Sequence, residues 1–221
     1  MKYKLIAGVA IAALMSFSCV SAEKESAFTY TGLYKSLKTS KQSEFSQLKL
    51  NFLLLQTGGS GLCPTDKVTL GDGEHQYEVL RSEEGALLLP LDKSLKQDHA
   101  AIRFTTASNI TCHLSMQIKV ADFELDTLTG ANLSSWYNQF EALYSTLAGW
   151  PGRYFMPEVT ALVLSFDRDI EMAIGKGKQR KVLTSQHKNL VINRDDIALM
   201  IDTPQLVSKG ELLSVLPQLS K

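Results

Sequence analysis

The chain has 221 residues, of which 23 are basic and 23 acidic, so its formal net charge at neutral pH is zero. Nucleic-acid-binding proteins of this size carry a clear excess of positive charge, and the balance here argues against a nucleic-acid partner. The longest apolar run lies near the N-terminus and is too short to cross a bilayer, so we expect no transmembrane segment.

The N-terminus has the pattern of a secretory signal peptide. Lys2 and Lys4 precede an apolar run over residues 5–15, and the small residues 20–22 stand ahead of the charged Glu23. We therefore predict that residues 1–22 are a cleaved signal peptide and that the mature protein is exported.

Cys19 raises the alternative of a lipid-anchored protein. Acylation signals place a leucine-like residue three positions before the cysteine and a small residue two positions before it. Ser16 and Phe17 stand at these positions, so we favour an exported protein without a lipid anchor.

Loss of the signal peptide leaves an even pair of cysteines, Cys63 and Cys112, in an oxidising compartment. Such a pair is expected to form a disulfide. The two cysteines close a loop of about 50 residues, for which loop-closure entropy gives roughly 4 kcal/mol of stabilisation. They lack the C-x-x-C spacing of a redox site, so we predict a structural cross-link.

The first half, residues 23–125, has the pattern of short strands separated by turns. The strand over residues 112–120 alternates without fault, and a hairpin is predicted around Asp72-Gly73. Thr31 is expected to cap a short helix, and Asp92 a helical turn. Together with the cross-link, this pattern predicts a sandwich-like half. The other predicted strands of this half cover residues 45–56, as a central strand, and residues 101–106.

The second half, residues 126–221, begins with one long amphipathic helix. Apolar residues recur at helical spacing over residues 133–147, with Thr129 or Asn132 as the N-cap and Gly149 at the C-terminal end. We predict a β-rich α+β fold in which the halves are separate domains or parts of one. Further predictions are strands over residues 159–166, 170–174 and 189–193, a basic turn over 175–181, a short helix over 195–200, and strand-like pieces at 204–207 and 212–216.

Motifs for ligands and catalysis are absent or incomplete. The glycine-rich segment 57–61 lacks the Gly-Lys-Ser/Thr end of a phosphate-binding loop and the second glycine of a nucleophile elbow. The four histidines have no partners at metal-ligand spacing. Residues 167–169 begin like a calcium loop, but Met172 and Lys178 occupy its glycine and glutamate positions. We predict no metal site, no cofactor and no catalytic motif.

Several short motifs together resemble a family of uncharacterised secreted proteins of Gram-negative bacteria, a domain of unknown function. The resemblance implies a periplasmic location and a paired cysteine, and it carries over no activity. The motifs are Phe28-Thr29-Tyr30 with Leu33-Tyr34, Leu62-Cys63-Pro64, residues 89–95, Thr111-Cys112 with Ser115-Met116-Gln117, and more weakly Trp150 and Pro157.

Two functional hypotheses follow. The first is a non-enzymatic binding or scaffold module of the cell envelope, with an unknown protein or ligand as its partner. The second is a hydrolase whose residues lie far apart in the sequence, with Asp92, His113, Asp167 and Asp169 as the candidates. A pocket in which two of these side chains meet would favour the hydrolase.

The segment after the long helix is the predicted contact surface of such a module. Trp150, Tyr154 and Phe155 lie in a stretch broken by two prolines and a glycine, beyond what the packing of the helix requires. Aromatic residues are enriched at binding hot spots, and loops concentrate binding residues. In the alternative interpretation these rings fold back to cover the end of the sandwich.

Overall fold

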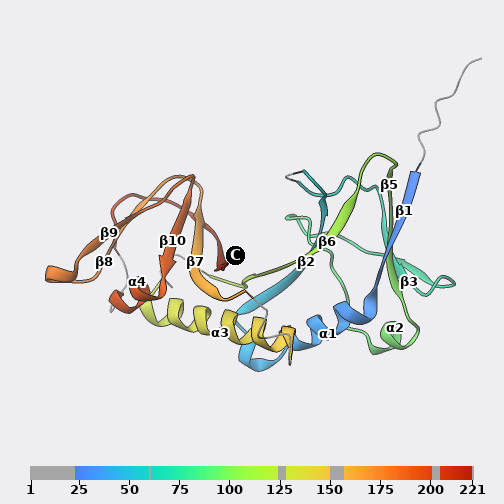
Figure 1. Cartoon of the computed structure of the whole chain (residues 1–221), viewed down its shortest axis with the longest axis horizontal. Coiled ribbons are helices and arrows are strands. Elements are labelled where there is room, and N and C mark those ends of the chain that lie inside the picture. The colour runs from blue at the N-terminus through green and yellow to red at the C-terminus, as the bar shows by residue number, and fades with distance from the viewer. Residues whose placement is uncertain (1–22, 60, 124–127, 150–156, 201–204, 221) are drawn as a thin grey trace, which may run out of the picture.

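The computed structural model describes residues 23–59, 61–123, 128–149, 157–200 and 205–220. Several antiparallel sheets and four helices make up this part of the chain, which confirms the β-rich α+β class. Two groups of sheets lie on either side of a long two-stranded ribbon, and α1 and α3 run along one side of the molecule (Figure 1).

One four-stranded sheet belongs to the first half, with the order β1-β5-β3-β4. Strand β1 pairs with β5 over its whole length although its first residues are charged. The polar start of β1 is possible because this strand lies at an edge and its first three residues are exposed. The bounds are β1 Glu23–Thr29, β3 Val68–Gly71, β4 Gln76–Glu78 and β5 Ala101–Ala107.

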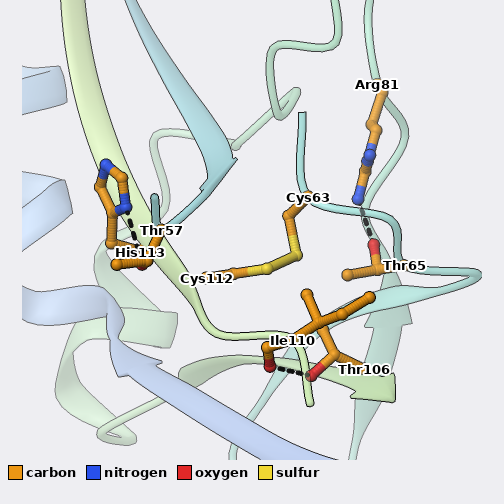
Figure 2. The surroundings of a disulfide bond; sticks show 8 residues. All are labelled: Thr57, Cys63, Thr65, Arg81, Thr106, Ile110, Cys112 and His113. Carbon is orange, nitrogen blue, oxygen red and sulfur yellow. Dashed lines mark hydrogen bonds between the residues drawn. A yellow bond between two sulfur atoms is a disulfide. The ribbon is translucent and has the colours of Figure 1, made fainter. Parts of the chain in front are cut away.

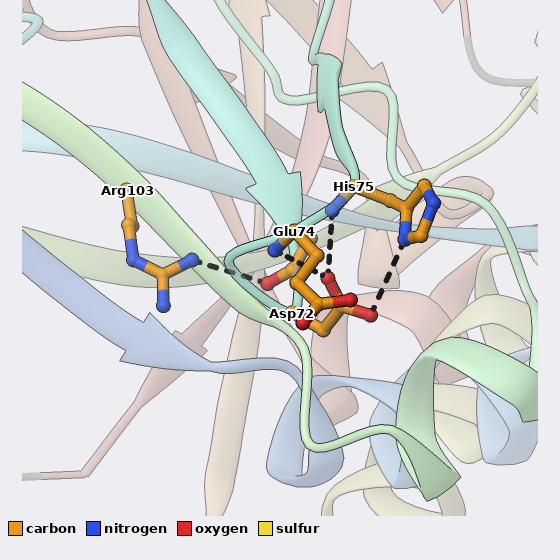
Figure 3. Close-up of polar contacts among 5 residues, drawn as sticks. Asp72, Glu74, His75 and Arg103 are labelled. Atoms are coloured by element: carbon orange, nitrogen blue, oxygen red, sulfur yellow. Dashed lines mark hydrogen bonds and ion pairs between the residues drawn. The ribbon is translucent and has the colours of Figure 1, made fainter.

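Strands β3 and β4 form the hairpin predicted around Asp72-Gly73 (Figure 3). The Asp72 carboxylate accepts hydrogen bonds from the backbone N–H groups of Glu74 (2.9 Å) and His75 (2.8 Å), and the latter bond holds the pKa of Asp72 below its usual value. Arg103 donates to the Gly71 carbonyl at 3.1 Å. A Cβ on Gly71 would lie 1.8 Å from the carbonyl oxygen of His75, so the turn needs glycine there.

Strands β2 (Leu48–Gln56) and β6 (Cys112–Val120) form the central ribbon, with Leu48 opposite Val120 and Gln56 opposite Cys112. The bounds of β6 agree with the strand predicted from its alternation. In addition to its pairing with β6, strand β2 forms hydrogen bonds through its other edge with segments 61–63 and 86–87. Residues 52–56 of β2 therefore have partners on both sides, which confirms the predicted central strand for that part of β2.

The first hydrophobic core lies between the four-stranded sheet and the Phe52–Leu54 part of the ribbon, so this half is sandwich-like. Helix α1 (Tyr30–Ser40) closes one side, and α2 (Lys93–Gln97) contacts α1. Tyr30 is fully buried; its hydroxyl donates to the Pro90 carbonyl and accepts from the Asp92 N–H at 3.1 Å. These two bonds tie α1 to the turn that starts α2.

The second core lies under α3 (Gly130–Ala148), whose buried face includes Trp136 and Phe140. Strand β7 (Val159–Phe166) is the middle of a sheet with the order β10-β7-β12, and β8 the middle of one with the order β11-β8-β9. The remaining bounds are β8 Glu171–Ile174, β9 Lys181–Thr184, β10 Asn189–Asn193, α4 Arg194–Leu199, β11 Gln205–Leu206 and β12 Leu212–Leu219, with short 3-10 helices at Ser43–Phe45 and Gly177–Gln179.

The ribbon contributes to both cores. Leu48 of β2 and Val120 of β6 belong to the second core, whereas Leu54 of β2 belongs to the first, and Leu114 of β6 packs against it. Leu50 packs against both. The two cores are therefore joined by paired strands rather than by a single linker.

Helix ends show which capping predictions hold. The Thr129 hydroxyl accepts the N–H of Asn132 at 3.1 Å, so Thr129 is the N-cap of α3. The Asp92 carboxylate caps α2 by accepting from Ser94. The prediction for Thr31 was wrong: α1 begins at Tyr30 with Thr29 as its N-cap, because burial of the Tyr30 ring fixes the start of the helix rather than a side-chain hydrogen bond.

Candidate functional site

The four residues of the hydrolase hypothesis lie on three separate elements, and no described hydrogen bond or ion pair joins any two of them. Asp92 caps α2 through the backbone N–H and the hydroxyl of Ser94, at 2.8 and 2.7 Å, and the hydroxyl bond lowers the pKa of Asp92. His113 lies exposed on β6 with its Nδ1 3.2 Å from the Thr57 hydroxyl (Figure 2). The pair with Thr57 joins two neighbouring strand ends.

The two aspartates after β7 are likewise engaged in local structure. Asp167 accepts from the Arg168 guanidinium, which lowers its pKa, and from the backbone N–H of Glu211 at 2.8 Å. Asp169 accepts from the N–H of Lys188 at 2.6 Å, which lowers its pKa, and from the Ser185 hydroxyl. A general acid at neutral pH needs a raised pKa, and each of these carboxylates has a lowered one.

The cysteine pair is bonded as predicted: Cys63 and Cys112 form a disulfide with their Cα atoms 5.8 Å apart (Figure 2). Cys63 is buried in the first core and belongs to segment 61–63, which bonds the outer edge of β2, and Cys112 is the first residue of β6. Nearby, Arg81 donates to the Thr65 hydroxyl and Thr106 to the Ile110 carbonyl. The disulfide therefore fixes one end of the ribbon to the first core.

Trp150, Tyr154 and Phe155, the predicted contact surface, lie outside the described residues. Whether these rings form a surface or cover the end of a core stays a prediction. The described chain offers grooves as candidate sites instead.

One such groove has a volume of about 480 Å³ and follows β2 where the two cores meet. Its walls come from the C-terminal end of α1, from segment 40–46, from the first part of β2 and from residues 87–89. Residues 37–52 are continuous in the sequence, whereas residues 87–89 and Ala121 lie far from them along the chain. Only the tertiary fold brings them together, and no local pattern could have indicated the groove.

Strand β2 presents a partly unpaired backbone edge in this groove. On the edge away from β6, the carbonyls of Phe52 and Leu54 accept from the N–H groups of Leu87 (2.8 Å) and Cys63 (2.7 Å). Successive residues of a strand point their backbone groups to opposite edges, so Leu48 and Leu50 also point outward. No described residue forms a hydrogen bond with those outward groups.

The side chains of the groove combine apolar surface with positive charge. Leu88 leaves 53% of its surface exposed at the rim, and Leu48 and Phe52 lie buried at the base. Lys41 and Lys49 are the charged lining residues, and no carboxylate lines the groove. The arrangement can bind an elongated, partly apolar ligand that carries negative charge.

Asn51 adds a polar group to the same lining. It is 95% buried, since its relative exposure is 5%, yet no described residue forms a hydrogen bond with its side chain. A buried amide normally has a hydrogen-bond partner, in the protein or in bound solvent. Among the described residues no fully buried side-chain nitrogen or oxygen lacks a hydrogen-bond partner, so the Asn51 amide atoms remain open to solvent in the groove.

A second groove, of about 340 Å³, lies between α3 and α4. Its main charged residue is Arg194, whose guanidinium stacks over the Tyr137 ring at 5.2 Å and lies 3.9 Å from the Glu141 carboxylate. Because Arg194 already has these partners, this groove has fewer unpaired charged groups for a ligand than the groove along β2.

Two further kinds of functional feature, a metal site and a membrane-spanning helix, concern the same described ranges. No group of three or more His, Cys, Asp or Glu residues within them is placed to hold a metal ion. None of the helices there combines the length and apolarity that a membrane crossing requires.

The geometry thus defines a strand-rich α+β protein with two cores, a disulfide and a groove along its central ribbon. The chain belongs to the family described as "Protein of unknown function (DUF2987)", whose match covers residues 22–166. The match includes the first core, the ribbon and both cysteines, and it ends at Phe166, the last residue of β7. No curated protein and no solved structure matches the chain.

Proposed function

We propose that the protein is an exported, periplasmic binding module of the cell envelope and that the groove along β2 is its binding surface. The observation that carries this proposal is the groove itself, where backbone groups and two lysines lack partners in the described chain. Binding needs such unpartnered groups, whereas hydrolysis needs reacting groups that face one another.

Two features support export. The signal-like segment ends at residue 22, and β1 begins at Glu23, so cleavage there would leave every described strand intact. The Cys63–Cys112 disulfide is of the kind that persists in oxidising compartments such as the periplasm. A periplasmic chain starting at Glu23, identified by mass spectrometry after cell fractionation, is the expected product.

The hydrolase hypothesis has no supporting observation of its own. Its candidate carboxylates each accept hydrogen bonds that stabilise a turn or a helix end, and none lines either groove. Stabilising a turn or a helix end is therefore a sufficient role for each of these carboxylates.

Site-specific cross-linking tests the binding surface. A photoreactive amino acid at position 88, on the rim of the groove, should cross-link a partner in cells that export the chain. The same amino acid at position 191, which has a comparable exposed fraction of 47% but lies on β10, is the matched control and should give no adduct. The proposal fails if position 88 gives no adduct or if both positions give the same ones.

A further inference from the structure

The unpaired part of β2 has a defined length and composition. It runs from the N–H of Leu48 through the N–H and C=O of Leu50 to the N–H of Phe52, after which residues 86–87 occupy the edge. At about 3.4 Å per residue these five residues span roughly 14 Å. Donors and acceptors alternate along this span, and an extended backbone is the partner whose own donors and acceptors match that spacing.

The fold already uses this edge for strand-like pairing next to the groove. Leu87 donates to the Phe52 carbonyl at 2.8 Å, and Leu53 is bridged to Ala86. The chain then leaves the edge, because Leu88 bonds the Leu80 carbonyl instead. A peptide bound along Leu48–Phe52 would continue the line of pairing that segment 86–87 begins.

Charge selects among extended peptides. Lys49 lies directly opposite Lys119 across the ribbon, and like charges in this position repel. Glu84 relieves the repulsion on one side, since both its carboxylate oxygens lie 2.6 Å from the Lys119 ammonium. Lys49 and Lys41 have no described ion-pair partner, so the groove keeps positive charge that a carboxylate can neutralise.

We propose that the groove binds an extended, acidic peptide segment of a partner protein, which adds to the outer edge of β2 as a further strand. The proposal rests on the proposed function, because it names the class of ligand for the same surface. Leu88 and the buried leucine and phenylalanine of β2 would pack against the apolar side chains of the peptide, and the two lysines against its carboxylates. A second copy of this chain is a poorer occupant, because each copy would bring its own Lys41 and Lys49 to the interface.

The test uses eight-residue peptides selected from a displayed random library on the purified exported chain. Selection should enrich Asp or Glu together with alternating apolar residues. Leu50→Pro removes the outward N–H and leaves the bonds to β6, which come from the flanking residues, in place. We expect Leu50→Pro to weaken peptide binding at least tenfold, measured by fluorescence anisotropy, whereas Leu50→Val, which keeps the N–H, should change binding less than threefold.

Two further comparisons keep the test decisive if Leu50→Pro folds poorly. Peptides methylated on alternate backbone nitrogens should bind the unchanged protein at least tenfold more weakly than their parents, because they cannot pair with β2. Lys49→Gln should weaken binding and its salt dependence, whereas Lys35→Gln, on the exposed face of α1 away from the groove, should not.

Strand addition is overturned if no peptide is selected, if the methylated peptides bind as well as their parents, or if sedimentation shows that the edge is already occupied by a second copy. Its failure is separable from that of the binding module. If position 88 still cross-links a partner in the Leu50→Pro chain, the groove is a binding surface but not a site of strand addition. If position 88 cross-links nothing in the unchanged chain, both proposals fail.

Discussion

The two cores differ in size and in how they are held together. Among the described residues, the second core has 24 buried members and is covered by the 19-residue helix α3, whereas the first has 12. The disulfide lies in the smaller core. Because a small core buries too little apolar surface to be stable by itself, covalent and polar anchors matter more there than in the larger core.

Removal of the disulfide should give the largest effect. Replacing Cys63 and Cys112 by alanine should lower the free energy of unfolding by about 4 kcal/mol, since the cross-link closes a 49-residue loop. Hydrogen exchange should show faster opening in β5 of the first core than in β7 of the second. Equal acceleration in both strands would contradict the idea that the cross-link serves the smaller core.

A pair of large-to-small substitutions, one in each core, compares the stability of the two cores directly. Ile102 on β5 and Leu162 on β7 are both fully buried on the middle strands of their sheets. Each change to alanine should cost about 3 kcal/mol, measured by urea unfolding. In the chain without the disulfide, Ile102→Ala should abolish the structure of the first core while Leu162→Ala leaves it detectable. If both variants lose the first core equally in that background, the two cores do not differ in reserve stability.

Two buried tyrosines test the polar anchors. The Tyr30 hydroxyl bonds both Pro90 and Asp92, whereas the Tyr137 hydroxyl bonds the Val159 carbonyl at 2.5 Å; burial raises the pKa of both phenols. Tyr30→Phe should cost about 2 kcal/mol and Tyr137→Phe about 1 kcal/mol, because two partners are lost in the first case and one in the second. Thermal unfolding of the two variants measures both values, and a reversed order would contradict the argument.

The smallest expected effect is a change in how the free energy of unfolding depends on pH under acidic conditions. The hydrogen bond from the N–H of Lys188 lowers the pKa of Asp169 in the folded protein. The ionised carboxylate therefore stabilises the fold at pH values above the pKa of an unperturbed aspartate, about 3.9. This contribution is lost as the pH falls through the lower pKa of the folded state. Asp169→Asn should therefore flatten the loss of stability below about pH 4. Unfolding by urea at pH 5 and pH 3 measures the slope, and an unchanged slope would show that this carboxylate is not linked to folding.

Much of the fold could be predicted from the sequence, because strong alternation and an even pair of cysteines are local or countable signals. Strands β6, β7 and β10 have the predicted bounds, and the disulfide is the predicted one. Strand β9 was missed, since its basic start at Lys181 was interpreted as part of a turn. Its pairing with β8 outweighs that local pattern.

The candidate site could not be predicted. Its lining joins the continuous segment 37–52 to residues 87–89 and Ala121, which only the tertiary fold brings to β2. The aromatic segment that drew attention in the sequence lies outside the described residues, and the lysines of the groove belong to no motif. An unpaired strand edge is a tertiary property, because it depends on which segments fail to reach the strand.

The shared ribbon also governs when the chain can complete its structure during synthesis. Strand β2 pairs with β6 across the intervening residues 57–111, so the ribbon cannot form until β6 has been made. Pairing over such long sequence separations is slow, since the intervening loop must close first. Closure of the loop between β2 and β6 is therefore expected to limit the rate at which both cores fold.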